Sequence, residues 1–252
     1  MDSELIRSME EVSMNALPSL QTVYYDGWVL RFANGYTRRS NSVNPLYSTQ
    51  SGIEIGEKIE LCEKLYRSKG LRVVFKLTDA ATPSDLNTIL DARGYAHGDY
   101  SPVSIQLAGL DKLDRLSSHV VERSEESSDD WHESFIQLNK FPKEHSATLK
   151  RMLDAVVPGK CHFAIRRDGE IICCGLAVFQ GEYVGLFDIV TDTGCRRQGL
   201  GVAITVDMMK WGKEHGARKA YLQVVAANEP AVRLYEKLGF AELYKYWYRV
   251  KE

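Results

Sequence analysis

The second half of the chain alternates between two hydrophobic periods, one of two residues and one near 3.6. The shorter period predicts strands and the longer one predicts amphipathic helices. Two helices come first, and three strands with short turns follow them. The predicted elements, in order, are helices at Trp131–Asn139 and His145–Val156, strands at Cys161–Arg167, Ile171–Gln180 and Tyr183–Val190, a helix at Gly199–His215, a strand at Ala220–Val225, a helix at Glu229–Leu238 and a strand at Leu243–Val250.

The first half shows the same mixture of periods. A turn signal at Asn34-Gly35 predicts a hairpin between its first two strands. The predicted elements are strands at Trp28–Ala33 and Arg38–Val43, a helix at Ile53–Ser68, a strand at Arg72–Leu77, a helix from Thr82 to about Arg93 and a strand at Ser101–Leu107.

The most polar and acidic stretch, 116–130, separates the two halves. It predicts two domains, residues 1–115 and residues 116–252. Both halves contain a helix, a strand, a Pro-led helix stopped by Gly (Gly94 or Gly239) and a closing strand. This shared order predicts an internal duplication, so the two halves would be related copies.

Composition narrows the class of protein. The chain has 252 residues, 44% of them hydrophobic, and a formal charge of −2. These values exclude disordered and fibrous classes and fit one large domain or two small ones. The apolar runs are too short for a membrane span, and the first residues lack the apolar core of a signal peptide. Five Cys without a C-x-x-C pair, and His without metal spacing, favour reduced thiols and no metal site. We therefore expect a cytoplasmic protein that binds neither membranes nor nucleic acids.

A glycine-containing segment, Arg196 to Gly201, lies between a predicted strand and a predicted helix. The start of a helix offers unpaired N–H groups and a positive dipole end, and two arginines add charge, so the segment can bind phosphate groups. The alternative is a tight turn beside a solvated basic pair. A Walker loop is excluded because Leu200 follows Gly199, and a dinucleotide fingerprint is excluded by Ile204.

A second motif begins at Asn228 and ends at Phe240. Asn228 suits the N-cap of a helix and Pro230 suits its first turn. Asn228, Ala231 and Tyr235 share one helix face because they lie at i, i+3 and i+7. Taken alone, Tyr235 is better explained as a core aromatic whose hydroxyl is hydrogen-bonded.

Together, R-x-x-G-x-G opening one helix and N-x-x-A-x-x-L-Y-x-x-x-G-F forming the next resemble the GCN5-related N-acetyltransferase (GNAT) superfamily. The resemblance covers about Asp129 to Glu252. It implies an α/β (α+β) fold in which helices flank a mixed, mostly antiparallel central sheet. The whole chain is similar to two-part bacterial members whose N-terminal half is a degenerate copy, so the fold would occur in two tandem related halves.

The resemblance implies roles for individual residues. Acetyl-CoA would be the cosubstrate, with its pantetheine arm paired to Ile189, Val190 and Thr191 and contacted by Asn228. Tyr235 would be the general acid near the sulfur. The diphosphate would lie on Arg196, Arg197, Gln198, Gly199, Leu200, Gly201 and Val202.

The sequence departs from the family pattern at the general base. Many members have a glutamate on the fifth strand, where this chain has Gln223, and an amide cannot take a proton. Asp188 is the first substitute and Glu182 a distant second, although Asp188 is also compatible with a structural or solvent-facing carboxylate.

The first half has no R-x-x-G-x-G, so it would bind no CoA. Its polar set would either recognise an acidic substrate group or form a solvated hairpin face. The set comprises Arg31, Tyr36, Arg38, Arg39 and Asn41.

The chain is thus expected to be an acetyl-CoA-dependent N-acetyltransferase in which an amine attacks directly in a ternary complex. The acceptor would be an amine of a small molecule or of a protein. The alternative is a non-catalytic CoA-binding sensor or assembly protein, and exposed strand edges allow a homodimer.

Overall fold

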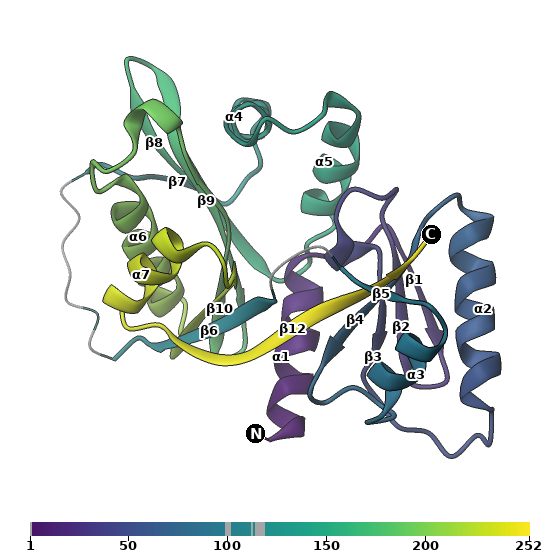
Figure 1. Ribbon diagram of the computed structural model, residues 1–252. Helices are drawn as coiled ribbons and strands as arrows, with labels where there is room; N and C mark the ends of the chain where they lie inside the picture. Colours follow the sequence, from purple (N-terminus) through teal and green to yellow (C-terminus); the bar gives the residue numbers. More distant parts are fainter. Residues whose placement is uncertain (1, 99–101, 112, 114–118) are drawn as a thin grey trace. The chain divides into compact units, whose positions relative to one another are not determined.

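A computed structural model describes residues 2–98, 102–111, 113 and 119–252 (Figure 1). The chain forms two compact units. Unit 1 comprises Met1–Val103 and Tyr244–Glu252, and unit 2 comprises Ser104–Leu243. The predicted domains, 1–115 and 116–252, are each continuous in sequence, whereas the C-terminal residues of the chain belong to unit 1. Residues 112 and 114–118, beside the predicted boundary, lie outside the described part.

Unit 1 begins with a helix that the sequence reasoning did not predict. Its elements are α1 Ser3–Ala16, β1 Gln21–Tyr25, β2 Trp28–Phe32, the 3-10 helix η1 Arg38–Ser40, β3 Val43–Pro45, α2 Ile55–Ser68, β4 Val73–Thr78, α3 Leu86–Ala92, β5 Ala96–His97 and the part of β12 (Ala241–Lys251) from Tyr244 onward.

The strands of unit 1 lie in the order β1-β2-β3-β4-β12. Neighbours are antiparallel except β3 and β4, which are parallel. Alternation along β4 sends Phe75 into the apolar cluster that α2 and α3 complete, whereas Lys76 contacts Glu10 of α1. Helices α1 and α2 therefore cover opposite faces of this sheet (Figure 1).

Unit 2 contains most of the elements predicted for the second half. They are β6 Val103–Gly109 from Ser104 onward, β7 Glu122–Ser124, α4 Asp129–Asn139, the 3-10 helix η2 Lys143–His145, α5 Ser146–Asp154, β8 Gly159–Arg167, β9 Glu170–Gln180, β10 Tyr183–Thr191, the 3-10 helix η3 Thr193–Cys195, α6 Leu200–Glu214, β11 Lys219–Val225, α7 Glu229–Lys237 and the start of β12.

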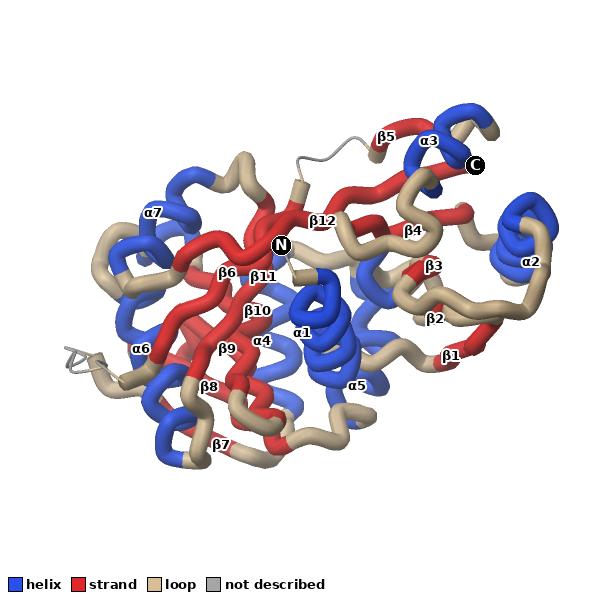
Figure 2. Tube along the Cα trace, turned by 90° about the horizontal axis from the view of Figure 1, so that it is seen from below, coloured by secondary structure: helices blue, strands red, loops and turns tan. Residues whose placement is uncertain are grey.

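The strands of unit 2 lie in the order β6-β11-β10-β9-β8-β7. Strands β7 to β10 pair antiparallel, and β10 pairs parallel with β11. Helix α6 packs on β8, β9 and β10, and α4 packs on the opposite face of β9 and β10 (Figure 2). The core under α6 contains Phe163, Ile204 and Trp211. The expected arrangement of a mixed, mostly antiparallel sheet flanked by helices is confirmed.

The predicted helices and most predicted strands are confirmed to within a few residues. The strand predicted at Arg38–Val43 is wrong over most of its length, because η1 occupies Arg38–Ser40 and the strand begins only at Val43. The cause is Asn41, whose side-chain oxygen accepts from the N–H groups of Ala33 (2.7 Å) and Gly35 (3.0 Å) and so stabilises a loop. In the described part of the chain, no helix is long and apolar enough to cross a membrane.

Candidate functional site

Strands β10 and β11 separate partway along their length. Their parallel ladder runs from Tyr183–Lys219 to Leu186–Leu222 and, in the described chain, ends there. One extra residue is inserted in β10 relative to β9 between Phe187 and Val190, and Asp188 has a φ of +54°. Such a bulge bends a strand and re-aims its backbone. Beyond it, Val190 and Thr191 still pair with β9, but the described ladder with β11 has ended, so the edge of β10 that faces β11 can pair with an extended ligand.

A glycine permits this geometry. A Cβ at Gly185 would lie 2.4 Å from the ring of Phe187 and 2.6 Å from that of Tyr221. These two rings pack edge to face with centroids 5.8 Å apart, just before the bulge. Gly185 therefore lets two aromatic side chains meet where the strands separate.

The glycine-containing segment follows β10 and η3. Arg197 has a φ of +62° and Gly199, the N-cap of α6, a φ of +81°. The first N–H groups of a helix have no intrahelical acceptor, and the described chain shows none for Leu200, Gly201 or Val202. The first turn of α6 has no acidic residue. The segment thus combines free backbone donors, a positive helix end and two exposed arginines, which suits an anion.

Side chains from outside the motif contact this segment. Arg167, at the end of β8, donates to the side-chain oxygen of Gln198 at 2.6 Å, and the His119 ring lies 3.0 Å from the Gln198 carbonyl oxygen. Sequence reasoning missed both residues, because they are far from the motif along the chain and belong to no local pattern.

Helix α7 lies against the start of α6. A Cβ on Gly201 would come within 3.3 Å of Leu234 Cδ1, so the Leu234 side chain would have to shift slightly to admit one. Asn228 is the N-cap of α7, as predicted, with its side-chain oxygen accepting from Ala231 N at 3.4 Å. The two motifs recognised in the sequence are therefore neighbours in the fold.

Tyr235, on α7, is half-buried and packs edge to face against Phe240 at 5.9 Å. Burial raises the pKa of its phenol to about 12, with a smaller electrostatic contribution from Cys173 on β9. The Cys173 thiol lies 3.2 Å from the Thr191 hydroxyl at the end of β10. Tyr235 is therefore protonated at neutral pH and lies near the last residues of β10.

Asp188 lies on the other face of the sheet. Successive residues of a strand face opposite sides, and β9 carries Cys173 and Cys174 in succession. Cys173 interacts with Tyr235, whereas Cys174 interacts with Asp188, although burial is the main cause that raises the pKa of both thiols. A phenol and a carboxylate thus lie on opposite sides of the opening between β10 and β11.

The other residues predicted for base chemistry differ in position. Gln223 follows directly after the end of the ladder on β11. Glu182 precedes β10 at its far end and pairs with Lys219 at 3.2 Å. At about 3.3 Å per residue, Glu182 lies roughly 20 Å along the strand from Asp188. Asp188, Ile189, Val190 and Thr191 thus lie where β10 and β11 separate, whereas Glu182 lies far from this opening.

Two of the five residues in the polar set of unit 1, Arg31 and Asn41, have structural roles. Arg31 is buried and donates to the backbone carbonyls of Arg39 (2.8 Å) and Leu17, so it is not part of a solvated face. Burial lowers its pKa to about 10. Asn41 is buried as well, and its side chain forms hydrogen bonds with the backbone of Ala33, Gly35 and Thr37.

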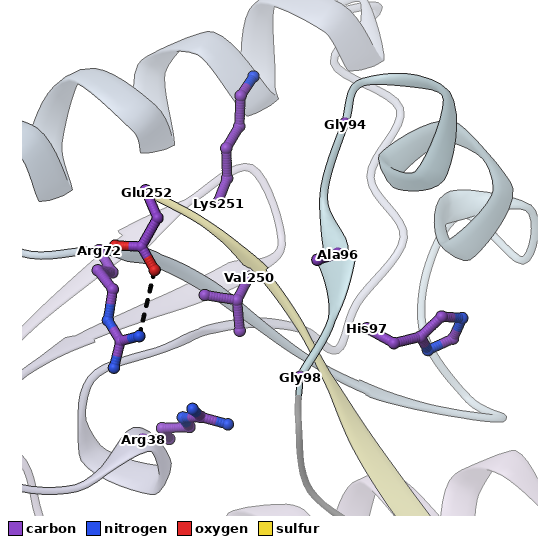
Figure 3. Close-up of a pocket in the computed structure, with 9 residues that line it drawn as sticks. All are labelled: Arg38, Arg72, Gly94, Ala96, His97, Gly98, Val250, Lys251 and Glu252. Atoms are coloured by element: carbon purple, nitrogen blue, oxygen red, sulfur yellow. Dashed lines mark hydrogen bonds and ion pairs between the residues drawn. The ribbon is translucent and has the colours of Figure 1, made fainter.

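A cavity of about 380 Å³ lies in unit 1, and Arg38, Arg72 and His97 are among the residues that line it (Figure 3). Its charged groups do not converge on one point. Arg72 pairs with Glu252 at 3.2 Å, and Lys251 extends away to pair with Glu63 at 3.0 Å. Among the described residues, no group of three or more His, Cys, Asp or Glu could hold a metal ion.

Comparisons with known proteins agree with this geometry. The sequence model of a family described as "Probable histone acetyltransferase Rv0428c C-terminal" matches residues 3–249. The "Uncharacterized N-acetyltransferase YobR" of Bacillus subtilis is 28% identical over 248 residues, which cover 98% of each chain. The ribosomal protein bS18-alanine N-acetyltransferase of Escherichia coli K12 is 31% identical over 81 residues, 32% of this chain and 55% of that protein.

Solved structures show the same fold. A GCN5-related N-acetyltransferase from Kribbella flavida superposes with a TM-score of 0.69 at 16% identity, covering 97% of this chain and 95% of that one. A tandem GNAT protein from the clavulanic acid biosynthesis pathway gives a TM-score of 0.69 at 14% identity, with coverage of 96% and 87%. With the family match over nearly the whole sequence, these findings show that the chain belongs to the Rv0428c C-terminal acetyltransferase family of the GNAT superfamily and is an N-acetyltransferase.

Proposed function

We propose that the protein transfers an acetyl group from acetyl-CoA to an amine by direct attack in a ternary complex. One observation carries the proposal: the anion site at the start of α6 and the opening between β10 and β11 are joined by a single continuous segment, 188–202. A ligand with a diphosphate at one end and an extended amide-containing arm at the other fits this arrangement.

The residues present suit acetyl-CoA. Its diphosphate would accept from the backbone N–H groups of Gln198 to Val202, with Arg196 and Arg197 neutralising its charge. Its arm would pair with the backbone of Ile189, Val190 and Thr191, and Asn228 would contact it from α7. Bound in this way, the cosubstrate supplies an activated acetyl thioester near Tyr235.

Asp188 is the proposed general base. An alkylammonium has a pKa of about 10.4, so the amine must lose a proton before or during attack. Once the ammonium has lost its first proton to solvent, the neutral nitrogen forms a bond to the acetyl carbon and the carbon–sulfur bond breaks, so that CoA leaves as a thiolate. The second proton, which the nitrogen loses on becoming an amide, passes to Asp188. A backbone N–H beside the bulge would stabilise the negative charge on the carbonyl oxygen.

Tyr235 would act on the departing sulfur mainly as a hydrogen-bond donor. Its pKa of about 12 exceeds that of a typical thiol, about 8.5, by roughly 3.5 units. Complete proton transfer to a free thiolate would therefore be uphill by about 5 kcal/mol. Partial transfer that strengthens as charge develops avoids most of this cost, so the rate gain is moderate.

The amine would approach from the Asp188 face, which α4 covers. A cavity of about 260 Å³ lies on this side at the end of β10, and Ser134 and Gln137 of α4 line it together with Glu170 and Asp192. The names of the relatives include acceptors that are protein amines, a histone and a ribosomal protein alanine. We propose an amine of a protein or of a small molecule as the acceptor class.

The test is thiol release from acetyl-CoA over a panel of peptide, polyamine and amino-sugar amines, with binding measured separately by calorimetry. Amine-dependent release supports the proposal. Tight binding without release from any amine would favour the CoA-binding sensor or assembly protein instead. Absence of binding would refute both.

The Asp188→Asn variant tests the base. Asn tolerates the positive φ of this position, so the bulge should persist. We expect kcat to fall about a hundredfold, a typical contribution of a general base, with little change in acetyl-CoA affinity. Near-normal kcat would show that Asp188 is a structural carboxylate.

We also propose that the protein acts without nucleic acids or membranes and that it forms a homodimer. Strand β1 is a sheet edge with uncharged, largely exposed residues, which supports a homodimer. Sedimentation of the wild-type chain and of a Val23→Lys variant on that edge tests this. Salt-sensitive DNA binding would contradict the first expectation.

A further inference from the structure

Arg167 connects two points of the anion-binding segment. Its guanidinium donates to the side-chain oxygen of Gln198 at 2.6 Å and contacts Cys195 Sγ at 3.5 Å. These two residues lie on either side of Arg196 and Arg197. Arg167 itself is the last residue of β8, before the turn into β9, and is remote from the motif in sequence. One side chain of the sheet thus holds both sides of the segment.

The segment between these contacts needs restraint. Arg197 has a φ of +62°, a conformation that costs a non-glycine residue roughly 1–2 kcal/mol. Such conformations persist only where surrounding contacts enforce them. Asp192 stabilises the preceding turn through its side chain, which accepts from Gly194 N at 2.7 Å. Between Cys195 and the start of α6, the described hydrogen bonds to side chains both involve Gln198: Arg167 donates to its side-chain oxygen, and the His119 ring contacts its carbonyl oxygen.

The orientation of Gln198 matters because its backbone N–H precedes those of Gly199 and the first turn of α6. A shift of the 195–198 backbone would turn these donors away from a common point. The Arg167–Gln198 hydrogen bond is charge-assisted, which makes it stronger than a neutral one, although its exposure to solvent weakens it.

We infer that Arg167 is a positioning residue for the cosubstrate: it holds the 195–198 segment in the conformation that binds the diphosphate. The inference rests on the proposed function. Arg167 acts through Gln198 and Cys195, so it affects the binding of the diphosphate and leaves the acetyl-transfer step unchanged.

The test compares Arg167→Gln and Arg167→Lys with Arg166→Gln. Arg166 is the matched control because it carries the same charge one residue away but pairs with Glu122 and Asp130 and has no described contact with the segment. Each variant is assayed with acetyl-CoA and with S-acetylpantetheine, a donor without the diphosphate. We expect both Arg167 variants to raise KM for acetyl-CoA about tenfold, the effect of one moderate hydrogen bond. Their kcat and their KM for S-acetylpantetheine should stay within twofold of wild type.

Several results would overturn the inference. Normal KM in Arg167→Lys would mean that charge alone matters, and equal losses with both donors would mean general disruption of the fold. An Arg166→Gln variant as impaired as Arg167→Gln would remove the specificity of the contact. Hydrogen exchange of the 195–199 amides, measured without any donor, should be faster in Arg167→Gln; unchanged exchange would also contradict positioning. If the wild-type protein binds no acetyl-CoA, the proposed function fails. The exchange measurement needs no donor, so it still tests whether Arg167 positions the segment.

Discussion

Units 1 and 2 share one order of elements but differ at the end of the corresponding strand. In each unit, three antiparallel strands lead into a helix, and the next strand pairs parallel with the third: β1-β2-β3-α2-β4 in unit 1 and β8-β9-β10-α6-β11 in unit 2. A further helix follows in both, α3 or α7. The internal duplication stays a prediction, but the shared order makes the two units each other's best control.

The third strand of each set, β10 in unit 2 and β3 in unit 1, ends differently. Strand β10 bulges at Asp188 and leaves the ladder with β11, whereas β3 pairs with β2 in regular register. Strand β3 ends at Pro45, which has no N–H to donate, and the Pro45 carbonyl accepts from Thr82 N at 3.0 Å. Pro45 therefore offers an extended ligand no donor and a carbonyl that already accepts a hydrogen bond, whereas β10 beyond its bulge has no described ladder pair with β11.

The two helix N-termini also carry opposite chemistry. Helix α6 begins after Arg196 and Arg197 and has no acid in its first turn, whereas α2 has Glu54 at its N-cap and Glu57 in its first turn. Carboxylates at that position satisfy the helix dipole and repel a phosphate. The comparison teaches that the same arrangement of strand, loop and helix suits an anion only where no acidic side chain compensates the helix end.

Unit 1 instead buries charge against its sheet. Lys76 of β4 and Glu10 of α1 form an ion pair with both side chains almost fully buried, and Tyr244 donates to Glu10 at 2.8 Å. Lys76 also lies 4.1 Å from the centre of the Tyr246 ring. Burial lowers the pKa of Lys76, and the charge of Glu10 opposes that shift. These contacts fit a structural role.

The largest effect is expected for Lys76→Met, which leaves the Glu10 carboxylate buried beside one hydroxyl. The free energy of unfolding should fall by about 3–5 kcal/mol, as is typical when one partner of a buried pair is removed. Urea unfolding measures the change. Adding Glu10→Leu should recover most of the loss, because the buried carboxylate that lost its ion-pair partner is then gone. A cost below about 1 kcal/mol for Lys76→Met would contradict a structural ion pair.

Next in size is Gly201→Glu, which adds a carboxylate to the second residue of α6. It should weaken acetyl-CoA binding about a hundredfold, or about 2.7 kcal/mol, by charge repulsion and by displacing Leu234. Calorimetry measures the change, and Gly201→Ala isolates the steric part. The matched control is Gly56→Glu, because Gly56 is the second residue of α2. Equal losses in the two Glu variants would refute the assignment of the site to unit 2.

Features of the fold and of the candidate site could be predicted from the sequence where they depend on residues close together along the chain. The caps and glycines of α6 and α7 are local signals, so the start of α6 at Gly199 and the N-cap role of Asn228 could be predicted from the sequence, whereas anion binding there stays a prediction. The bulge at Asp188 was not predicted, because it depends on the register between β9 and β10. Arg167 and His119 were missed for the same reason: their contacts join segments far apart in sequence. The assignment of Tyr244–Glu252 to unit 1 depends on pairing with β4, which no local pattern indicates.

The third prediction concerns Tyr235→Phe, which removes the proposed donor to the sulfur and keeps the packing on Phe240. We expect kcat to fall about thirtyfold with unchanged affinity for acetyl-CoA. Equal losses of both would point to packing alone. The pH profile adds a second readout. With a pKa of about 12, the Tyr235 phenol keeps its proton below that pH and loses it only as the pH rises through about 12. Wild-type kcat should therefore show no fall due to Tyr235 between pH 8 and about 10.

The smallest effect is expected for Glu57→Gln at the start of α2. The charge of Glu57 faces the positive helix end, so its loss should cost about 0.3–1 kcal/mol of unfolding free energy at low salt, and less at 1 M salt because the interaction is screened. Urea unfolding at the two salt concentrations measures this. The same variant should gain no affinity for acetyl-CoA, because Pro45 still closes the end of β3 and α2 still lacks the arginine pair of α6. Binding of a second equivalent would show that the charge of Glu57 alone keeps unit 1 from binding the cosubstrate, and the strand end would then have no part in the difference between the units.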